Sequence, residues 1–172
     1  MIIDTATPDD LEPLLVLVHK AYRGDSARAG WTHESDLLDG MRTDHAALAE
    51  IVADPAQRLL VARDGDDLAG CIVLTDKGGA LAYIGMVTVD PVRQAAGLGR
   101  QLLDAVEAEA RAAFGATRAE MTVISQRTEL IAWYERRGYV RTGERRPFPA
   151  ADPRFGLPKR DDLEFVVLEK RL

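Results

Sequence analysis

Hydrophobic and polar positions along this chain follow two patterns, which together predict a mixed α/β order of elements. Helices are indicated where a capping residue opens a stretch of apolar residues at helical spacing and glycine or proline follows it. Strands are indicated by short apolar runs between turn residues. Helices are expected at residues 8–22, 32–39, 44–52, 98–114 and 128–137. Strands are expected at residues 1–4, 58–63, 68–75, 80–89, 119–124, 139–143 and 163–172.

Two turns divide the middle of the chain into consecutive strands. Asp64-Gly65-Asp66-Asp67 separates the strands at 58–63 and 68–75, and Lys77-Gly78-Gly79 separates the second of these from 80–89. Such short glycine-bearing connections join antiparallel neighbours. The pattern therefore predicts an antiparallel meander over residues 58–89.

Length and charge limit the classes of function. With 172 residues, of which 47% are apolar, the chain suits one domain over residues 1–172. Its net charge of −6 argues against nucleic-acid binding and is compatible with a cationic partner such as an amine. No run of 18 apolar residues is present, so no membrane span is expected.

The few cysteines and histidines bear on location and on metals. Cys71 is the single cysteine and cannot form an internal disulfide, and no signal peptide is apparent, so a cytoplasmic protein is expected. One cysteine and three histidines without ligand spacing predict no metal site. Cys71 lies in an apolar strand and is interpreted as a buried small hydrophobe.

The strongest chemical signal is a strand that ends at Val89 and is followed by a glycine-bearing loop and a helix. The first turn of a helix leaves amide groups without internal partners, and the helix dipole adds positive potential there. Gly97 and Gly99 have no side chains, so an anion can approach the backbone closely. The segment therefore predicts a phosphate or pyrophosphate site. An ordinary connection between a strand and a helix is the alternative interpretation.

The spacing excludes two common phosphate loops. A P-loop needs Gly-Lys-Ser/Thr, and a dinucleotide fingerprint needs a third glycine, and neither is present. The segment instead reads Gln-x-x-Gly-x-Gly from Gln94 to Gly99 and resembles the pyrophosphate motif of the GNAT acetyltransferase superfamily. A second segment, Trp133-Tyr134-Glu135-Arg136-Arg137-Gly138-Tyr139, resembles the Tyr-x-x-x-Gly-Phe/Tyr helix of the same family, and the order of elements matches along nearly the whole chain.

The resemblance implies a fold and a cofactor. The fold is α/β (α+β), with a mixed, mostly antiparallel sheet of about six to seven strands flanked by helices and a splay between the strands Ala80–Val89 and Ala119–Ile124. The co-substrate is acetyl-CoA, whose pantetheine arm pairs with the backbone of Val87, Thr88 and Val89 as an added strand. Its pyrophosphate binds the amides of the residues after the flanking Gln94, which are Ala95, Ala96, Gly97, Leu98, Gly99 and Arg100.

The resemblance also implies the reaction, which is acetyl transfer to a primary amine by direct attack in a ternary complex. Tyr134 matches the position of a tyrosine that serves as general acid, although an aromatic residue on an apolar helix face is the alternative. Arg127 and Thr122 stand where many relatives have an asparagine and a glutamate base. The base is therefore not identified, and Glu34, Asp36 and Glu120 are candidates.

The acceptor site in this family is formed by the region after the first helix and by the loop between the last two strands, here 22–42 and 145–160. The segment 141–160 holds six basic and two acidic residues and four of the eight prolines. Trp31, Glu34 and Arg146 are candidate substrate-binding residues. The arginines at 145, 146, 154 and 160 could bind an anionic group on the acceptor, or they could form a solvated basic loop or contact the 3′-phosphate of CoA.

Two other classes of function stay open at this stage. The chain could be a non-catalytic acetyl-CoA sensor or regulatory subunit, because the asparagine is replaced and the base is unassigned. It could also be a structural partner with a degenerate cofactor site. The acceptor amine and the acyl chain preference are not determined by the sequence, and the resemblance leaves a homodimer open.

Overall fold

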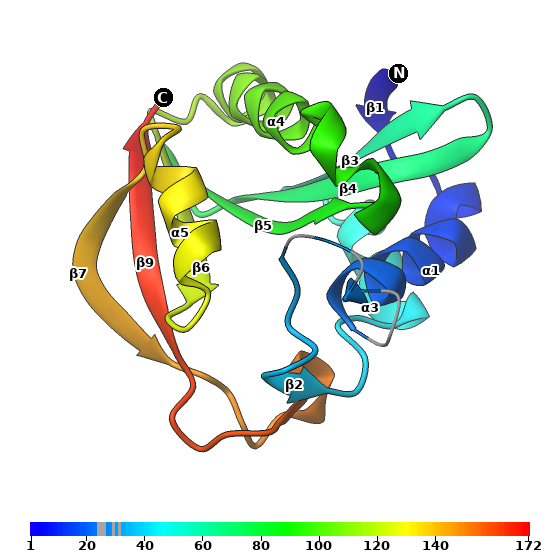
Figure 1. Cartoon of the computed structure of the whole chain (residues 1–172). Coiled ribbons are helices and arrows are strands. Elements are labelled where there is room, and N and C mark those ends of the chain that lie inside the picture. Colours follow the sequence, from blue (N-terminus) through cyan, green and yellow to red (C-terminus); the bar gives the residue numbers. More distant parts are fainter. Residues whose placement is uncertain (24–26, 29, 31) are drawn as a thin grey trace.

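A seven-stranded sheet forms the centre of the protein, for which the computed structural model describes residues 1–23, 27–28, 30 and 32–172 (Figure 1). Its strands are β1 (Ile2–Thr5), β3 (Gln57–Asp64), β4 (Asp67–Asp76), β5 (Leu81–Val89), β6 (Arg118–Ile124), β7 (Val140–Pro147) and β9 (Glu164–Arg171). The order across the sheet is β1-β3-β4-β5-β6-β9-β7, and the pair β5–β6 alone is parallel. The predicted mixed, mostly antiparallel sheet and the meander are confirmed.

Helices cover both faces of this sheet (Figure 1). One face packs against α1 (Leu11–Tyr22), which follows the 3-10 turn η1 (Pro8–Asp10), and against α3 (His45–Ala53). The opposite face packs against α4 (Leu98–Phe114) and α5 (Thr128–Glu135). In the described part of the chain, no helix is both long enough and apolar enough to cross a bilayer.

The alternation of side chains along β3 shows how one strand serves both faces. Leu60 and Ala62 belong to the core beneath α4, whereas Leu59 and Val61 belong to the core beneath α1 and α3. Successive residues of a strand point to opposite faces, so a strand that is covered on both sides is apolar at every position. The continuous apolar run at 59–62 follows from that requirement.

The splay between β5 and β6 is present. These strands pair only through Leu81, Ala82 and Tyr83, so the remainder of β5 leaves the edge of β6. Met86 has a φ of +50°, and the register between β4 and β5 shifts beside it. A bulge of this kind bends a strand and increases its twist. The bulge therefore lies where β5 turns away from its neighbour.

One predicted helix is wrong. Residues 32–39 form turns followed by the short strand β2 (Leu38–Asp39), which pairs with β8 (Leu157–Pro158). Local propensity is overridden by two long-range contacts: Glu34 is buried in an ion-pair cluster, and the amide of Lys159 donates to the carbonyl of Leu37. The loop between β7 and β9 is thereby joined to the segment that follows α1.

The connection from β5 to α4 also differs in detail from the expected open loop. A 3-10 helix, η2 (Pro91–Ala96), precedes α4, and Gly97 forms the junction at a φ of +75°. A left-handed residue at this point requires glycine for its low cost. A side chain at Gly97 would meet no atom within 4 Å, so the space in front of the helix is open.

Candidate active site

A cavity of about 120 Å³ lies at the start of α4, between the free edge of β5 and the helix α5. Seven of the predicted cofactor-binding residues line it together: Val87, Thr88, Val89, Gln94, Gly97, Gly99 and Arg100. Tyr134 lines it from α5. Residues that are separated in the sequence by a strand and a helix therefore converge on one space, which is the geometry that the two motifs predict.

Free backbone donors line the start of α4. Within the part of the chain that the structure describes, the amides of Gly97, Leu98 and Gly99 have no protein acceptor. The amide of Arg100 instead donates to the carbonyl of Gly97 at 3.1 Å, so the prediction for this amide is wrong. Its position in the first helical turn already provides an acceptor, and Arg100 contributes an exposed guanidinium.

The other predicted residues of this segment lie beside the cavity. Ala96 is exposed and the side chain of Leu98 is buried in the core, so any role of these residues in binding is confined to the backbone. Ala95 belongs to η2. The side chain of Gln94 lies against Gly30, where an added Cβ would be 2.7 Å from the Gln94 Oε1.

A second cavity, of about 170 Å³, lies beside the preceding part of β5, from Tyr83 to Val87, and is called here the acceptor cavity. Its walls come from the segment after α1, from the splayed parts of β5 and β6, from the start of α5 and from the loop between β7 and β9. The two regions that the resemblance assigns to the acceptor, 22–42 and 145–160, both contribute to it.

The two cavities share a wall. Five residues line both of them: Tyr22, Val87, Arg127, Leu130 and Tyr134. A group bound in one cavity can therefore reach a group bound in the other at these side chains. This junction is the place where a donor and an acceptor would react.

Tyr134 lies at this junction, and its hydroxyl forms no hydrogen bond within the described residues. The side chain is 4% exposed, and its ring packs edge-on against Trp133 and Tyr139. Burial raises the pKa of the phenol well above its usual range, although the charge of Arg127 opposes the shift. The phenol therefore stays protonated at neutral pH and keeps a hydrogen that it can donate in a hydrogen bond.

Tyr22 fixes the strand opposite Tyr134. Its hydroxyl donates to the carbonyl of Val87 at 2.7 Å, just after the bulge at Met86. Burial raises the pKa of Tyr22, so this hydroxyl keeps the proton that the hydrogen bond needs. The sequence assigns Tyr22 to the apolar face of a helix and gives no sign of this contact.

Glu34 lines the acceptor cavity, but arginines occupy both of its oxygens. Arg23 donates to Oε2 at 2.9 Å, and Arg127 donates to Oε1 at 3.2 Å. Burial alone would raise the pKa of Glu34, but the charges of Arg127, Arg42 and Arg23 outweigh it and lower the pKa. A carboxylate with a lowered pKa is a poor general base. The structure therefore assigns Glu34 to organising the cavity.

The remaining acidic and basic candidates lie outside the two cavities. Arg146 binds Glu120 at 2.9 Å and Glu144 at 2.8 Å, and neither Arg146 nor Glu120 lines the two cavities, so the geometry gives no support to the predicted substrate contact of Arg146 or to Glu120 as a base. The pairing arises because β7 and β6 flank β9 in the sheet. Asp36 is exposed and pairs with Arg28. Trp31 lies outside the described residues.

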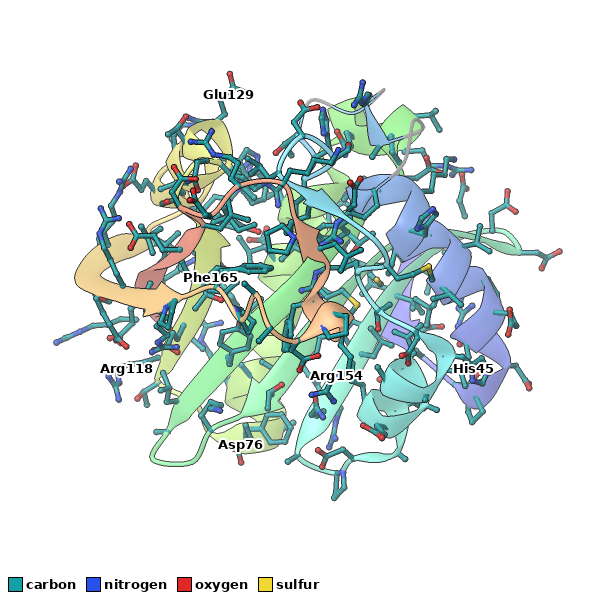
Figure 2. All side chains as sticks on the ribbon, turned by 90° about the horizontal axis from the view of Figure 1, so that it is seen from below. His45, Asp76, Arg118, Glu129, Arg154 and Phe165 are labelled. Carbon is teal, nitrogen blue, oxygen red and sulfur yellow. The ribbon has the colours of Figure 1, made fainter. Side chains whose placement is uncertain are left out.

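The basic loop is neutralised locally. Arg145 pairs with Glu164, Arg154 with Asp152, and Arg160 with Asp162. Figure 2 looks onto this loop, with Arg154 at its outer side and Phe165 behind it, where Phe165 lines the acceptor cavity. The loop contributes aromatic side chains to the cavity, while its arginines point to solvent or to their acidic neighbours.

The comparisons with known proteins agree with this geometry. The model of the acetyltransferase (GNAT) domain matches residues 34–148. The chain belongs to the GNAT acetyltransferase family. A GNAT-family relative, the "IAA acetyltransferase" of Azospirillum brasilense, is 31% identical over 107 residues, which cover 62% of this chain and 69% of the relative.

Solved structures share the fold over most or all of the chain. The smu.2055 protein of Streptococcus mutans UA159 has a TM-score of 0.74 at 17% identity, with 99% of both chains covered. A ribosomal-protein-alanine N-acetyltransferase from Brucella melitensis has a TM-score of 0.73 at 17% identity, with 100% of both covered. A GNAT acetyltransferase from Elizabethkingia anophelis with acetyl-CoA bound has a TM-score of 0.61 at 20% identity, covering 73% of this chain and 81% of the other.

Several residues of this GNAT site carry no signal in the sequence. Arg23 is 1% exposed and joins three segments, because it pairs with Glu34 and donates to the carbonyls of Asp39 and Phe155. Arg42 lines the acceptor cavity with its guanidinium carbon 5.5 Å from the Tyr22 ring centroid. Neither arginine belongs to a motif, and only the folded chain brings them to the site.

Proposed function

We propose that this chain is an acetyl-CoA-dependent N-acetyltransferase that transfers the acetyl group to a primary amine. The cavity at the start of α4 binds acetyl-CoA. Its pantetheine arm follows the free edge of β5 at Val87, Thr88 and Val89. Its pyrophosphate binds the free amides of Gly97, Leu98 and Gly99, with Arg100 and Arg137 alongside.

The reaction is direct attack of the amine on the thioester. The neutral amine nitrogen forms a bond to the acetyl carbonyl carbon, and the carbon–sulfur bond breaks. The nitrogen releases a proton to solvent, and the sulfur leaves as a thiolate that takes a proton from Tyr134. The resulting phenolate takes a proton back from solvent, so the enzyme is restored. A backbone amide near Val87 stabilises the charge that develops on the carbonyl oxygen.

Direct transfer is favoured over a covalent acyl-enzyme on the cysteine. Cys71 is 0% exposed and lines neither cavity. Burial raises the pKa of its thiol to about 12. A reactive cysteine needs the thiolate form, which this site disfavours.

The observation that carries the proposal is the shared wall of the two cavities. Tyr134 lines both of them, is protonated at neutral pH and has a hydroxyl without a partner in the described chain. The hydroxyl oxygen is not among the buried polar atoms without a partner, so it is accessible from the cavity and can bind a ligand there. The leaving sulfur of the thioester, placed at the junction, would be that ligand.

The test is Tyr134→Phe, assayed by thiol release from acetyl-CoA with a panel of primary amines. Since general acids contribute 10²- to 10⁴-fold, kcat should fall by about 100-fold or more. The affinity for acetyl-CoA, measured by calorimetry, should change little. Tyr139→Phe is the matched control, because its hydroxyl binds Glu107 outside both cavities; it should lower the melting temperature and leave kcat intact.

Two results contradict the proposal. Equal kcat values for Tyr134→Phe and the wild-type protein would remove Tyr134 from the chemistry. Tight acetyl-CoA binding with no thiol release for any amine would instead support the regulatory acetyl-CoA sensor.

A further inference from the structure

The acceptor cavity is positively charged, although the chain as a whole is acidic. Its described lining contains three arginines, Arg23, Arg42 and Arg127, and a single carboxylate, Glu34. Glu34 is already paired with Arg23 and Arg127. The cavity therefore keeps an excess of positive charge.

Arg42 forms no ion pair within 4 Å of any described residue, although its charge also acts on Glu34. Its guanidinium lies over the face of the Tyr22 ring, 5.5 Å from the centroid. Tyr22 in turn holds the carbonyl of Val87 at the junction of the cavities. Arg42 therefore lines the acceptor cavity beside a residue that also lines the junction.

Arg127 adds a second unused donor. Its side chain is 10% exposed, and its Nε is buried without a hydrogen-bond partner in the described part of the chain. A buried charged donor of this kind is costly unless a ligand completes it. Arg127 lines both cavities, so an acceptor at the junction can reach it.

The other walls of the cavity are aromatic. Three of the four tyrosines and three of the four phenylalanines of the chain line it: Tyr22, Tyr83, Tyr134, Phe148, Phe155 and Phe165. The cavity volume of about 170 Å³ is comparable to that of cavities of roughly 150 Å³ that hold a benzene molecule. An aromatic ring therefore fits this space in size and chemistry.

We propose that the acceptor is a small aromatic amine that also carries a carboxylate, with the carboxylate bound by Arg42 and Arg127 and the ring held by the aromatic walls. This inference rests on the proposed N-acetyltransferase function. In this proposal Arg42 and Arg127 bind the anionic group, and the arginines of the loop 145–160 do not. Those loop arginines pair with acidic neighbours and lie outside the cavity.

The positive cavity also gives the amine a physical reason to lose its proton. A positive charge nearby disfavours an ammonium ion and lowers its pKa, so the neutral nucleophile becomes more abundant. An amine without an anionic group would be repelled by the same charges. A carboxylate on the acceptor offsets that repulsion and allows the acceptor to bind.

The experiment compares four acceptors that differ in one group each: phenylalanine, phenylalaninamide, phenethylamine and alanine. Thiol release from acetyl-CoA gives kcat and KM for each. Because hydrogen bonds to charged groups are among the stronger ones, kcat/KM for phenylalanine should exceed that for phenylalaninamide and phenethylamine by about tenfold to 100-fold. Alanine, which lacks the ring, should also be a poorer acceptor.

Arg42→Gln tests the assignment of the charge. It should raise KM for phenylalanine by about tenfold or more and reduce the preference for phenylalanine over phenethylamine to about one. Arg154→Gln is the control, because Arg154 is exposed and paired with Asp152, and it should keep the preference. An unchanged preference in Arg42→Gln, or amines without a carboxylate being the better acceptors, would overturn the inference.

A separate binding measurement distinguishes this inference from the proposed function. 3-Phenylpropionate, which has the ring and the carboxylate but no amine, is titrated calorimetrically into the protein loaded with CoA. Weaker binding to Arg42→Gln than to the wild-type protein supports the inference even if no amine is acetylated. Equal binding to both proteins, or no binding to either, contradicts it.

Discussion

The hydroxyl of Tyr22 lies 2.7 Å from the carbonyl oxygen of Val87 and donates a hydrogen bond to it. This bond connects the end of α1 to β5 at the point where β5 has left β6 and follows the bulge at Met86. It fixes the backbone that both cavities share. The position of the cofactor strand therefore depends on a side chain from a distant helix.

Tyr22→Phe should weaken the site without removing it. A hydrogen bond of this kind contributes about 1 kcal/mol, so the melting temperature should fall by a few degrees. The looser backbone at Val87 should lower kcat/KM for acetyl-CoA by about fivefold to tenfold. Thermal denaturation and steady-state kinetics measure both effects. Kinetics identical to those of the wild-type protein would show that the strand holds its position without this bond.

The two ends of α4 offer a matched pair of glycines. Gly97 and Gly115 have φ values of +75° and +61°, and an added Cβ at either would meet nothing within 4 Å. Gly97→Ala and Gly115→Ala should therefore lose similar stability, about 1 kcal/mol each, through backbone strain alone. Only Gly97→Ala should weaken acetyl-CoA binding, by about tenfold, because its methyl occupies the open space before the helix.

Calorimetric titration of both variants with acetyl-CoA checks this prediction. Equal affinities in the two variants would place the pyrophosphate away from the start of α4.

Gly156 and Arg23 are in unusually close contact. Gly156 has a φ of +105°, and an added Cβ would lie 2.5 Å from the Arg23 Nη1. Gly156→Ala should displace Arg23 and with it the ion pair to Glu34, so the acceptor KM should rise by about tenfold and the melting temperature should fall. Gly143, at a φ of +85° with nothing within 4 Å, is the control that carries the backbone strain alone.

The same assays on Gly143→Ala and Gly156→Ala separate the effect of backbone strain from the effect of displacing Arg23. A Gly143→Ala variant that raises the acceptor KM as much as Gly156→Ala would assign the effect to general strain in the loop.

The ion pair between Asp10 and Arg63 should make stability depend on pH in acid. Hydrogen bonds from Arg63 lower the pKa of Asp10 from 3.8 to about 2. The unfolded chain therefore binds this proton at a higher pH than the folded chain does. The stabilisation is complete above pH 3.8 and is lost as the pH falls towards about 2, and it amounts to about 2 kcal/mol.

Urea unfolding of the wild-type protein and Asp10→Asn at a series of pH values checks this prediction. The difference in unfolding free energy between the two should shrink as the pH falls from about 4 to about 2. A difference that stays constant over this range would show that Asp10 titrates at the same pH in the folded and the unfolded chain.

Local sequence determined most of the elements and the cofactor side of the site. Helix α4 begins and ends at the residues predicted, because Gly97 and Gly115 supply the left-handed conformations that flank it. The Gln94–Gly99 motif and Tyr134 can each be found from local patterns, although α4 and β6 separate them and only folding brings them into one cavity. Signals of this kind act within a few residues and can be read without a structure.

Tertiary structure alone decided the acceptor side. The predicted helix at 32–39 is replaced by turns and β2 because Glu34 meets Arg23 and Arg127, and because β2 pairs with β8. One of these contacts, between Glu34 and Arg127, joins residues 93 positions apart. Folding also places Arg42 over the Tyr22 ring and pairs Arg146 with Glu120, and neither contact can be read from local sequence. What a charged side chain can bind depends on which oppositely charged side chains the fold places beside it.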